Sequence, residues 1–184
     1  MNSILKSTQL TFALFGVYLI SIYWIIVLKF NISAYHDRVE RSFNWIPFRE
    51  FVLYGKMDFP EIILNIFIFI PFGLYAGVLL KHWGFGKKVF LFFSLSFLFE
   101  ISQYIMEVGA FDITDLINNT LGGIIGLIIF MGLKKAFNSQ LKAQKFINIF
   151  ALIGTILIFS FLLFLKTNDL WIFRMNTIKT LGEL

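Results

Sequence analysis

The sequence predicts an all-α integral membrane protein, a polytopic bundle of five transmembrane helices with an interfacial or re-entrant segment in the first loop. Apolar residues make up 58% of the 184 residues, only 15% are charged, and the mean hydropathy is +0.80. Soluble domains carry about 25% charged residues, so this chain lacks the polar groups to cover a soluble surface. Long apolar stretches recur throughout, which predicts a single membrane domain over residues 1–184.

The apolar stretches have the length of membrane spans. A helix crosses the hydrocarbon core with about 20 apolar residues, within a range of about 17–25. The first stretch exceeds the 7–15 residues typical of a signal peptide and no small-residue cleavage site follows it, so we expect it to stay as a helix. The five predicted spans are Leu10–Leu28, Ile62–Leu80, Val89–Ile105, Leu116–Leu133 and Phe146–Leu165.

The first loop is the longest polar segment of the chain, and it carries an apolar patch of its own. Trp45–Phe48 and Phe51–Tyr54 are rich in aromatic and aliphatic residues. Together they are too short to span a bilayer, which predicts that the patch lies in the interface or re-enters the membrane.

The distribution of basic residues predicts the orientation. The net charge is +5, which in so apolar a chain favours the inner membrane surface over nucleic acid as a partner. The bases divide evenly between the two sides, but two short loops hold bases without any acid: Lys81, Lys87 and Lys88 in one, and Lys134, Lys135, Lys142 and Lys145 in the other. Short loops dominate orientation, so we expect the N-terminus inside and the C-terminus outside.

A carboxylate interrupts the third predicted span. Glu100 would cost about 2.5–3.5 kcal/mol at mid-bilayer on insertion scales, and Ser96 and Gln103 share its helix face at spacings of four and three residues. Such a residue typically faces the interior of a bundle or a water-filled cavity. One reading is therefore an outward-opening polar pocket. The other is a hydrogen-bonded clamp between helices, with Glu100 neutral.

More polar residues surround the start of the fourth predicted span. Asp112, Asp115 and Asn119 follow an i, i+3, i+7 spacing and would share one face of a helix. A capping role explains one of the two acids but leaves the other and the asparagine. Asn65 lies toward the same end of the second span. We therefore expect these side chains to converge with Glu100 and Gln103 on one outward cavity.

The chemistry of such a cavity has two readings. Carboxylate and amide oxygens suit a hard cation, and neighbouring carboxylates also suit acid–base catalysis. The sequence does not choose between them. In the spans themselves, Pro71 predicts a kink in the second helix, and Gly122-x-x-x-Gly126 predicts close packing between helices within the chain.

The motifs together resemble the VanZ-like family of bacterial membrane proteins over a core of about residues 44–126. Thr114 stands where that family usually has an aspartate, and Gly109 where it often has an arginine. The matching pieces are Asn44-Trp45-Ile46-Pro47-Phe48, Asn65 to Gly73 with Phe69, Pro71 and Phe72, Ser96 with Glu100 and Gln103, and Phe111-Asp112-Ile113-Thr114-Asp115-Leu116 with Asn119, Thr120 and Gly122.

The resemblance implies a multi-pass protein of the bacterial cytoplasmic membrane that acts on the cell envelope. Founding members of the family raise resistance to teicoplanin and related lipoglycopeptides. For this chain, that implies a contribution to resistance. Our first hypothesis for the site comes from the residues themselves: an acid-and-amide cluster walled by Phe-rich helices would engage a lipid-anchored ligand, either a lipid-linked cell-wall precursor or a lipoglycopeptide. The predicted ligand-binding residues are Asn65, Glu100, Gln103, Asp112, Asp115 and Asn119, and the predicted structural motif residues are Asn44, Pro47, Pro71, Gly73, Ser96, Gly122 and Gly126.

The alternative is an intramembrane enzyme that acts on a lipid-linked envelope precursor. Glu100 and Asp115 would then form the acid–base pair, with Asp112 as a further catalytic candidate. The sequence requires no cofactor. It leaves open whether a metal binds, whether the protein is an enzyme at all, and whether it is a monomer or a homodimer.

Overall fold

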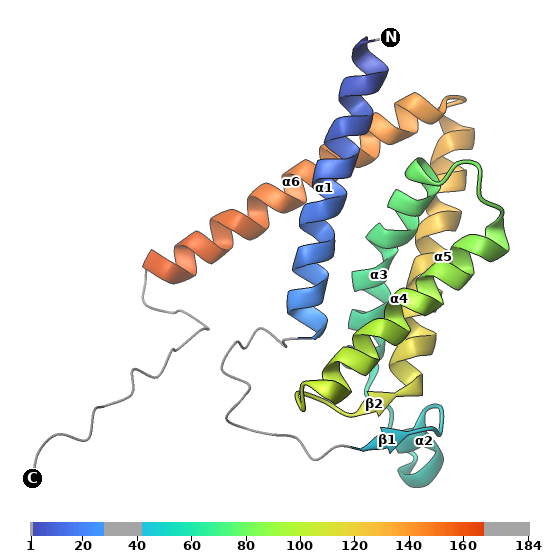
Figure 1. Ribbon diagram of the computed structural model, residues 1–184, viewed down its shortest axis with the longest axis vertical. Coiled ribbons are helices and arrows are strands. Elements are labelled where there is room, and N and C mark those ends of the chain that lie inside the picture. Colours follow the sequence, from blue (N-terminus) through green and yellow to red (C-terminus); the bar gives the residue numbers. More distant parts are fainter. Residues whose placement is uncertain (1, 28–41, 168–184) are drawn as a thin grey trace, which may run out of the picture.

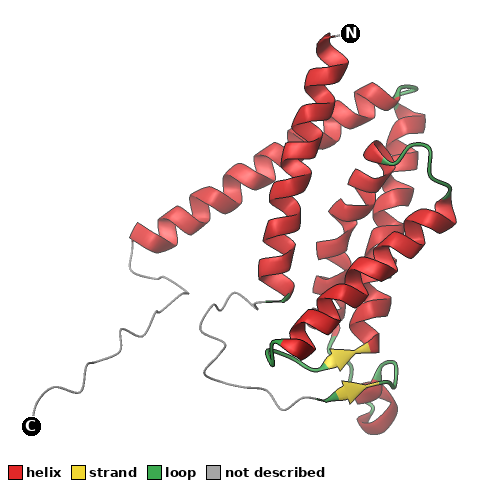
Figure 2. Cartoon of the chain, viewed as in Figure 1, coloured by secondary structure: helices red, strands yellow, loops and turns green. Residues whose placement is uncertain are grey.

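The computed structural model describes residues 2–27 and 42–167. Five of its helices are long and apolar enough to cross a membrane, which confirms the predicted fold class of a multi-pass membrane protein. Figures 1 and 2 show these helices as a bundle with a small strand pair at one end. The elements in order are α1 (Asn2–Ile26), β1 (Phe43–Asn44), α2 (Arg49–Tyr54), α3 (Phe59–Leu79), α4 (Phe85–Ile105), β2 (Phe111–Asp112), α5 (Ile113–Ala136) and α6 (Gln140–Thr167).

Local sequence signals explain where two of the spanning helices begin. Asp58 caps α3 by accepting a hydrogen bond from the backbone N–H of Glu61, with Pro60 in the first turn. Asp112 caps α5 by accepting from the N–H of Thr114. Asp112 thus has the capping role that the sequence left open for one of the two acids.

Helices α3 and α5 form the centre of the bundle, and glycines bring their backbones together. A Cβ atom at Gly122 would collide with the carbonyl oxygen of Ile66, and one at Gly126 with that of Ile70. On α3, a Cβ atom at Gly73 would collide with the carbonyl of Gly123. The prediction that Gly122-x-x-x-Gly126 packs within the chain is therefore confirmed.

A core rich in phenylalanine surrounds this glycine contact. Phe69 and Phe72 of α3 pack with Phe92 and Phe99 of α4, and all four side chains are buried. Their rings meet edge-on, with centroids 5.2–6.1 Å apart, an arrangement that aromatic rings favour. Helix α3 is continuous through Pro71.

Helix α6 contacts the bundle chiefly near its start, where polar side chains join it to α1. We call Ser7, Thr11, Gln144 and Asn148 the polar clamp, and all four are buried. The Thr11 hydroxyl accepts from Gln144 at 2.9 Å and lies 3.0 Å from the Asn148 side-chain oxygen, while Asn148 donates to the Ser7 carbonyl. Beyond this crossing, α6 runs away from the other helices (Figure 1).

The two ends of the bundle differ in chemistry. The start of α1 and the α3–α4 and α5–α6 connections lie at one end, together with the acid-free lysine clusters. The strand pair and α2 lie at the other end (Figure 1). Here α2 sits beyond the ends of the spanning helices, which favours the interfacial reading over the re-entrant one. The predicted outer C-terminus lies outside the described residues.

Candidate functional site

A short parallel strand pair organises the polar end of the bundle. β1 pairs with β2 so that Phe43 lies opposite Phe111 and Asn44 opposite Asp112. The N–H of Phe111 donates to the carbonyl of Ser42 at 3.1 Å. The pair therefore joins two motifs that lie more than sixty residues apart, the N-W-I-P-F stretch and the F-D-I-T-D stretch. We call residues 42–57, which carry β1 and α2, the foot.

Asp112 is the hub of the hydrogen bonds at this end. Its Oδ2 accepts from the Asn44 side-chain amide at 2.8 Å, and its Oδ1 accepts from the N–H of Thr114 at 2.7 Å. Its own backbone N–H donates to Oε2 of Glu100 at 2.9 Å. One residue thus links the foot, the start of α5 and the end of α4.

Two further hydrogen bonds close the site around α5. The N–H of Phe48 donates to the Thr114 hydroxyl at 3.0 Å, so Thr114 holds the foot through a neutral group. Asn65 of α3 donates to Oδ1 of Asp115 at 2.6 Å. Each of the two site aspartates therefore accepts a side-chain amide from another motif, which fixes the direction of its carboxylate.

Aromatic rings also join the foot to the bundle. Trp45 stacks on Phe43 with ring centroids 5.5 Å apart, and both rings contact Phe111. Phe43 also meets Tyr104 at 4.3 Å, near the end of α4. The foot is thus attached by both polar and aromatic contacts.

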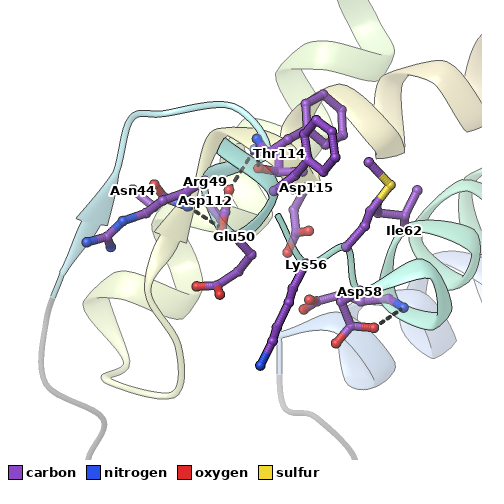
Figure 3. Close-up of a pocket in the computed structure, with 13 residues that line it drawn as sticks. Asn44, Arg49, Glu50, Lys56, Asp58, Ile62, Asp112, Thr114 and Asp115 are labelled. Carbon is purple, nitrogen blue, oxygen red and sulfur yellow. Dashed lines mark hydrogen bonds between the residues drawn. The ribbon is translucent and has the colours of Figure 1, made fainter. Parts of the chain in front are cut away.

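A small pocket of about 60 Å³ opens between the foot and the starts of α3 and α5. Figure 3 shows Asp115 pointing toward this space, with Glu50, Lys56 and Asp58 around its rim. Acids outnumber bases in its lining, which gives the pocket a negative charge. The charged residues that line it are Arg49, Glu50, Lys56, Asp58, Glu61, Asp112 and Asp115.

The residues predicted to line one cavity fall into two groups. Asp112 and Asp115 line the pocket, and Asn65 reaches it through its bond to Asp115. Glu100, Gln103 and Asn119 lie buried behind it and are absent from its lining. Gln103 donates to the carbonyl of Ile26, and Asn119 donates to the Ser96 hydroxyl at 3.0 Å. These two amides therefore join neighbouring helices, as the alternative reading of Glu100, hydrogen bonding between helices, expects.

The predicted structural motif residues take distinct positions. Asn44 holds Asp112, Ser96 holds Asn119, and Pro47 is exposed in the turn before α2. Pro71 lies inside α3. Gly73, Gly122 and Gly126 form the close approach of α3 and α5.

Sequence reasoning missed several residues of this region. Glu50, Asp58 and Glu61 line the pocket. Asp58 could have been found, because an acid two residues before Pro60 is a helix-start signal. Asn118 is also buried, beside the predicted Asn119. Among the described residues, no three His, Cys, Asp or Glu side chains are placed to hold a metal ion.

Comparisons with known proteins agree with the motifs. The VanZ/LLP1 family model matches residues 15–138, a wider region than the motif core from residue 44 to 126. Protein VanZ from Enterococcus faecium is 36% identical to this chain over 157 residues, which covers 84% of this chain and 94% of that protein. No solved structure matches the chain. The chain therefore belongs to the VanZ/LLP1 family of membrane proteins.

Proposed function

We propose that this protein contributes to resistance against glycopeptides of the teicoplanin type, and that its pocket faces outward and engages a lipid-anchored ligand. Family membership supports the link to resistance. The observation that carries the site is the set of hydrogen bonds that aims Asp112 and Asp115: Asn44 holds the first at 2.8 Å and Asn65 the second at 2.6 Å. Carboxylates held in fixed directions are suited to recognising polar groups of a ligand.

The surroundings of the pocket favour a ligand with a lipid anchor. Trp45 and Tyr54 of the foot are 63% and 65% exposed, and Phe51 and Val52 are exposed beside them. Apolar groups at this level of the membrane suit the boundary between headgroups and acyl chains. A ligand that is polar at one end and lipid-anchored at the other would contact both surfaces. The candidates are a lipid-linked cell-wall precursor and the lipoglycopeptide itself.

The geometry favours binding over acid–base catalysis. A general acid or base must reach the substrate within hydrogen-bond distance. Glu100 is completely buried, and its Oε2 accepts from the N–H of Asp112. It does not line the pocket that Asp115 lines. The enzyme hypothesis pairs Glu100 with Asp115, but only Asp115 of these two carboxylates lines the pocket.

The outward orientation can be tested by cysteine labelling, because the chain contains no cysteine. Lys56 lies on the foot and His82 in the α3–α4 connection, and both are exposed. In intact cells we expect a membrane-impermeant maleimide to label Lys56→Cys, and to label His82→Cys only after permeabilisation. The physical reason is the acid-free lysine cluster around His82, which favours the cytoplasmic side. The reverse labelling pattern would show that the pocket faces the cytoplasm and would contradict the proposal of an extracellular ligand.

The resistance function can be tested in a teicoplanin-sensitive Gram-positive host. We expect the wild type to raise the inhibitory concentration of teicoplanin, and Asp115→Asn to bring it back toward the empty vector. Asparagine keeps an oxygen for Asn65 but removes the charge. A charged hydrogen bond contributes about 1.5–3 kcal/mol, so we expect ligand affinity to fall about tenfold or more. The inhibitory concentration of vancomycin, which has no acyl tail, is measured for comparison.

The matched control for this test is Ser102→Ala. Ser102 lies near the same end of α4, and its hydroxyl donates to the carbonyl of Leu98 in its own helix. The Ser102→Ala variant should raise the inhibitory concentration of teicoplanin as much as the wild type does, when the two proteins are present in the membrane in equal amounts. If Asp115→Asn also keeps the shift, the pocket is not the working site. If the wild type gives no shift, the resistance proposal itself fails.

A further inference from the structure

A second cavity lies far from the polar pocket, in the middle of the spanning helices. It has a volume of about 490 Å³ and is formed by α1, α3, α5 and α6. We call it the interhelical groove. Tyr18 of α1 and Pro71 and Tyr75 of α3 line it on one side, and Phe150 and Gly154 line it from α6.

The groove exists because α6 is fastened at one end only. The polar clamp ties α6 to α1, and Ala143 and Ile147 pack against Val78 and Phe130 just beside it. After this point α6 diverges from the bundle, as Figure 1 shows. The angle between α6 and the remaining helices leaves the space that the groove occupies.

The lining of the groove is suited to hydrocarbon. No lining residue carries a charge. Three of its hydroxyls are already used within the protein: Tyr18 donates to the carbonyl of Ile68, Ser21 to that of Val17 and Thr155 to that of Ala151, each at 2.8 Å. Water needs two to four polar partners to occupy a cavity. These walls offer it few, so an apolar occupant is favoured.

The groove is continuous with the surface that faces the lipid. Every lining residue falls within the membrane-spanning parts of its helix. Phe150, Ile158 and Phe159 line the groove and are also 60%, 50% and 61% exposed. A lipid chain can therefore enter sideways from the bilayer, without crossing a polar barrier.

The size of the groove distinguishes a lipid chain from another helix. Its volume of about 490 Å³ lies within the range of about 300–1,000 Å³ that is typical of sites for single small molecules. A single hydrocarbon chain matches a cavity of this class, whereas a helix is about 10 Å across with its side chains.

We propose that the interhelical groove is a binding site for one acyl chain of a membrane phospholipid. The chain lies between α1 and α6 and supplies the packing that α6 lacks beyond the polar clamp. This site is separate from the polar pocket, and it does not depend on the proposed function.

The test uses a phospholipid with a diazirine in its acyl chain. The full protein is reconstituted into vesicles of phosphatidylglycerol and phosphatidylcholine with a rising fraction of the probe, and the labelled residues are mapped by mass spectrometry. We expect labelling at the groove, around Tyr75 and Phe150, to saturate. Phe90 of α4, which is 70% exposed, provides the comparison with bulk lipid and should label in proportion to the probe.

Two glycines provide a matched pair of variants. Gly154 lines the groove and Gly16 of α1 does not, and a Cβ atom at either would meet nothing within 4 Å. Gly154→Trp should fill the groove and lower its labelling about tenfold, equivalent to ~1.4 kcal/mol of binding free energy. Gly16→Trp should leave it unchanged. Ala151→Leu, a smaller change in the same wall, should give a weaker drop in the same direction.

Three results would overturn the proposal. Labelling of the groove could rise in proportion to the probe, as at Phe90, which would make its lipid ordinary bulk lipid. Gly154→Trp and Ala151→Leu could both leave the labelling unchanged. The groove could also stay unlabelled, and cross-linking of Phe150→Cys between two chains would then identify a second copy as the occupant. Each of these measurements is made without a glycopeptide. If the lipid site is disproved, the resistance proposal is therefore unaffected, and a negative resistance test does not affect the lipid site.

Discussion

Gly126→Leu should prevent the protein from accumulating as a folded species in the membrane. A Cβ atom at this position would collide with the carbonyl oxygen of Ile70 and approach the Cα of Gly73. Both obstacles are backbone atoms of α3, so no side chain can rotate away. Overpacking a core typically costs about 1–3 kcal/mol. For Gly126→Leu the loss of stability should be at or above the upper end of this range, because α3 and α5 must separate along their whole interface.

The measurement is the amount of monodisperse protein after mild detergent extraction, followed by thermal unfolding of any that survives. Gly132→Leu is the control, because it lies on the same helix and nothing lies within 4 Å of the Cβ atom it would carry. It should behave like the wild type. Equal losses in the two variants would show that the backbone contact of α3 and α5 does not hold the bundle together.

The five spanning helices were predictable because length and apolar composition are local properties. Each predicted span falls within an observed helix or ends at most two residues beyond it; the first ends at Leu28, which lies outside the described residues. The membrane requires every backbone group of a span to be bonded within its own helix, so an apolar stretch of sufficient length has few alternatives. The glycine contact was also predictable, since small residues one turn apart are a common basis of helix packing.

The polar clamp was not predicted, because two of its four residues, Ser7 and Gln144, fell outside the predicted spans. The last span was expected to begin at Phe146, which left Gln144 in a loop beside lysines. The helix begins at Gln140 instead, and Gln144 is buried against Thr11. Pairing of Thr11 with Asn148 across 137 positions is a consequence of the tertiary structure, which a single sequence does not reveal.

Of the residues predicted for the site, Asp112 and Asp115 line the pocket, but the predicted arrangement of the set differs from the structure. The i, i+3, i+7 argument treated Asp112, Asp115 and Asn119 as one helical face. Asp112 is instead extended, with φ −123° and ψ 120°, and belongs to β2. On α5 itself, Asp115 contacts Asn65 of α3 while Asn119 contacts Ser96 of α4. The strand pair that sets this arrangement has two residues per strand, too few to show an alternating pattern.

Glu100→Ala should release the foot from the bundle. The variant removes the acceptor of the Asp112 N–H, which donates to Oε2 of Glu100 at 2.9 Å. A fully buried donor left without an acceptor costs about 1–3 kcal/mol, and the Asp112 N–H, which is part-buried, should cost toward the lower end of that range. Asp112 also receives the Asn44 amide, and Thr114 receives the N–H of Phe48. Loss of the hydrogen bond between Asp112 and Glu100 should therefore weaken the two hydrogen bonds that attach the foot to Asp112 and Thr114.

Hydrogen exchange of the Asp112 and Thr114 amides measures this release directly. Opening made easier by about 1.4–2.8 kcal/mol speeds exchange roughly tenfold to a hundredfold. Exchange in the middle of α5, around Gly123, should stay slow and serves as the internal reference. Equal acceleration at both places would mean that the whole bundle is destabilised and not the foot alone.

Glu100→Gln separates a structural role of Glu100 from a role of its charge. Glutamine keeps a side-chain oxygen at the same distance from the backbone, so it can still accept from the Asp112 N–H. If Glu100 acts by holding β2 in place, Glu100→Gln should exchange like the wild type and keep the teicoplanin shift, while Glu100→Ala loses both. If Glu100→Gln keeps slow exchange and still loses the shift, the charge itself is needed. Glu100 would then belong with Asp115 in the working chemistry, and the intramembrane enzyme would become the better account of the site.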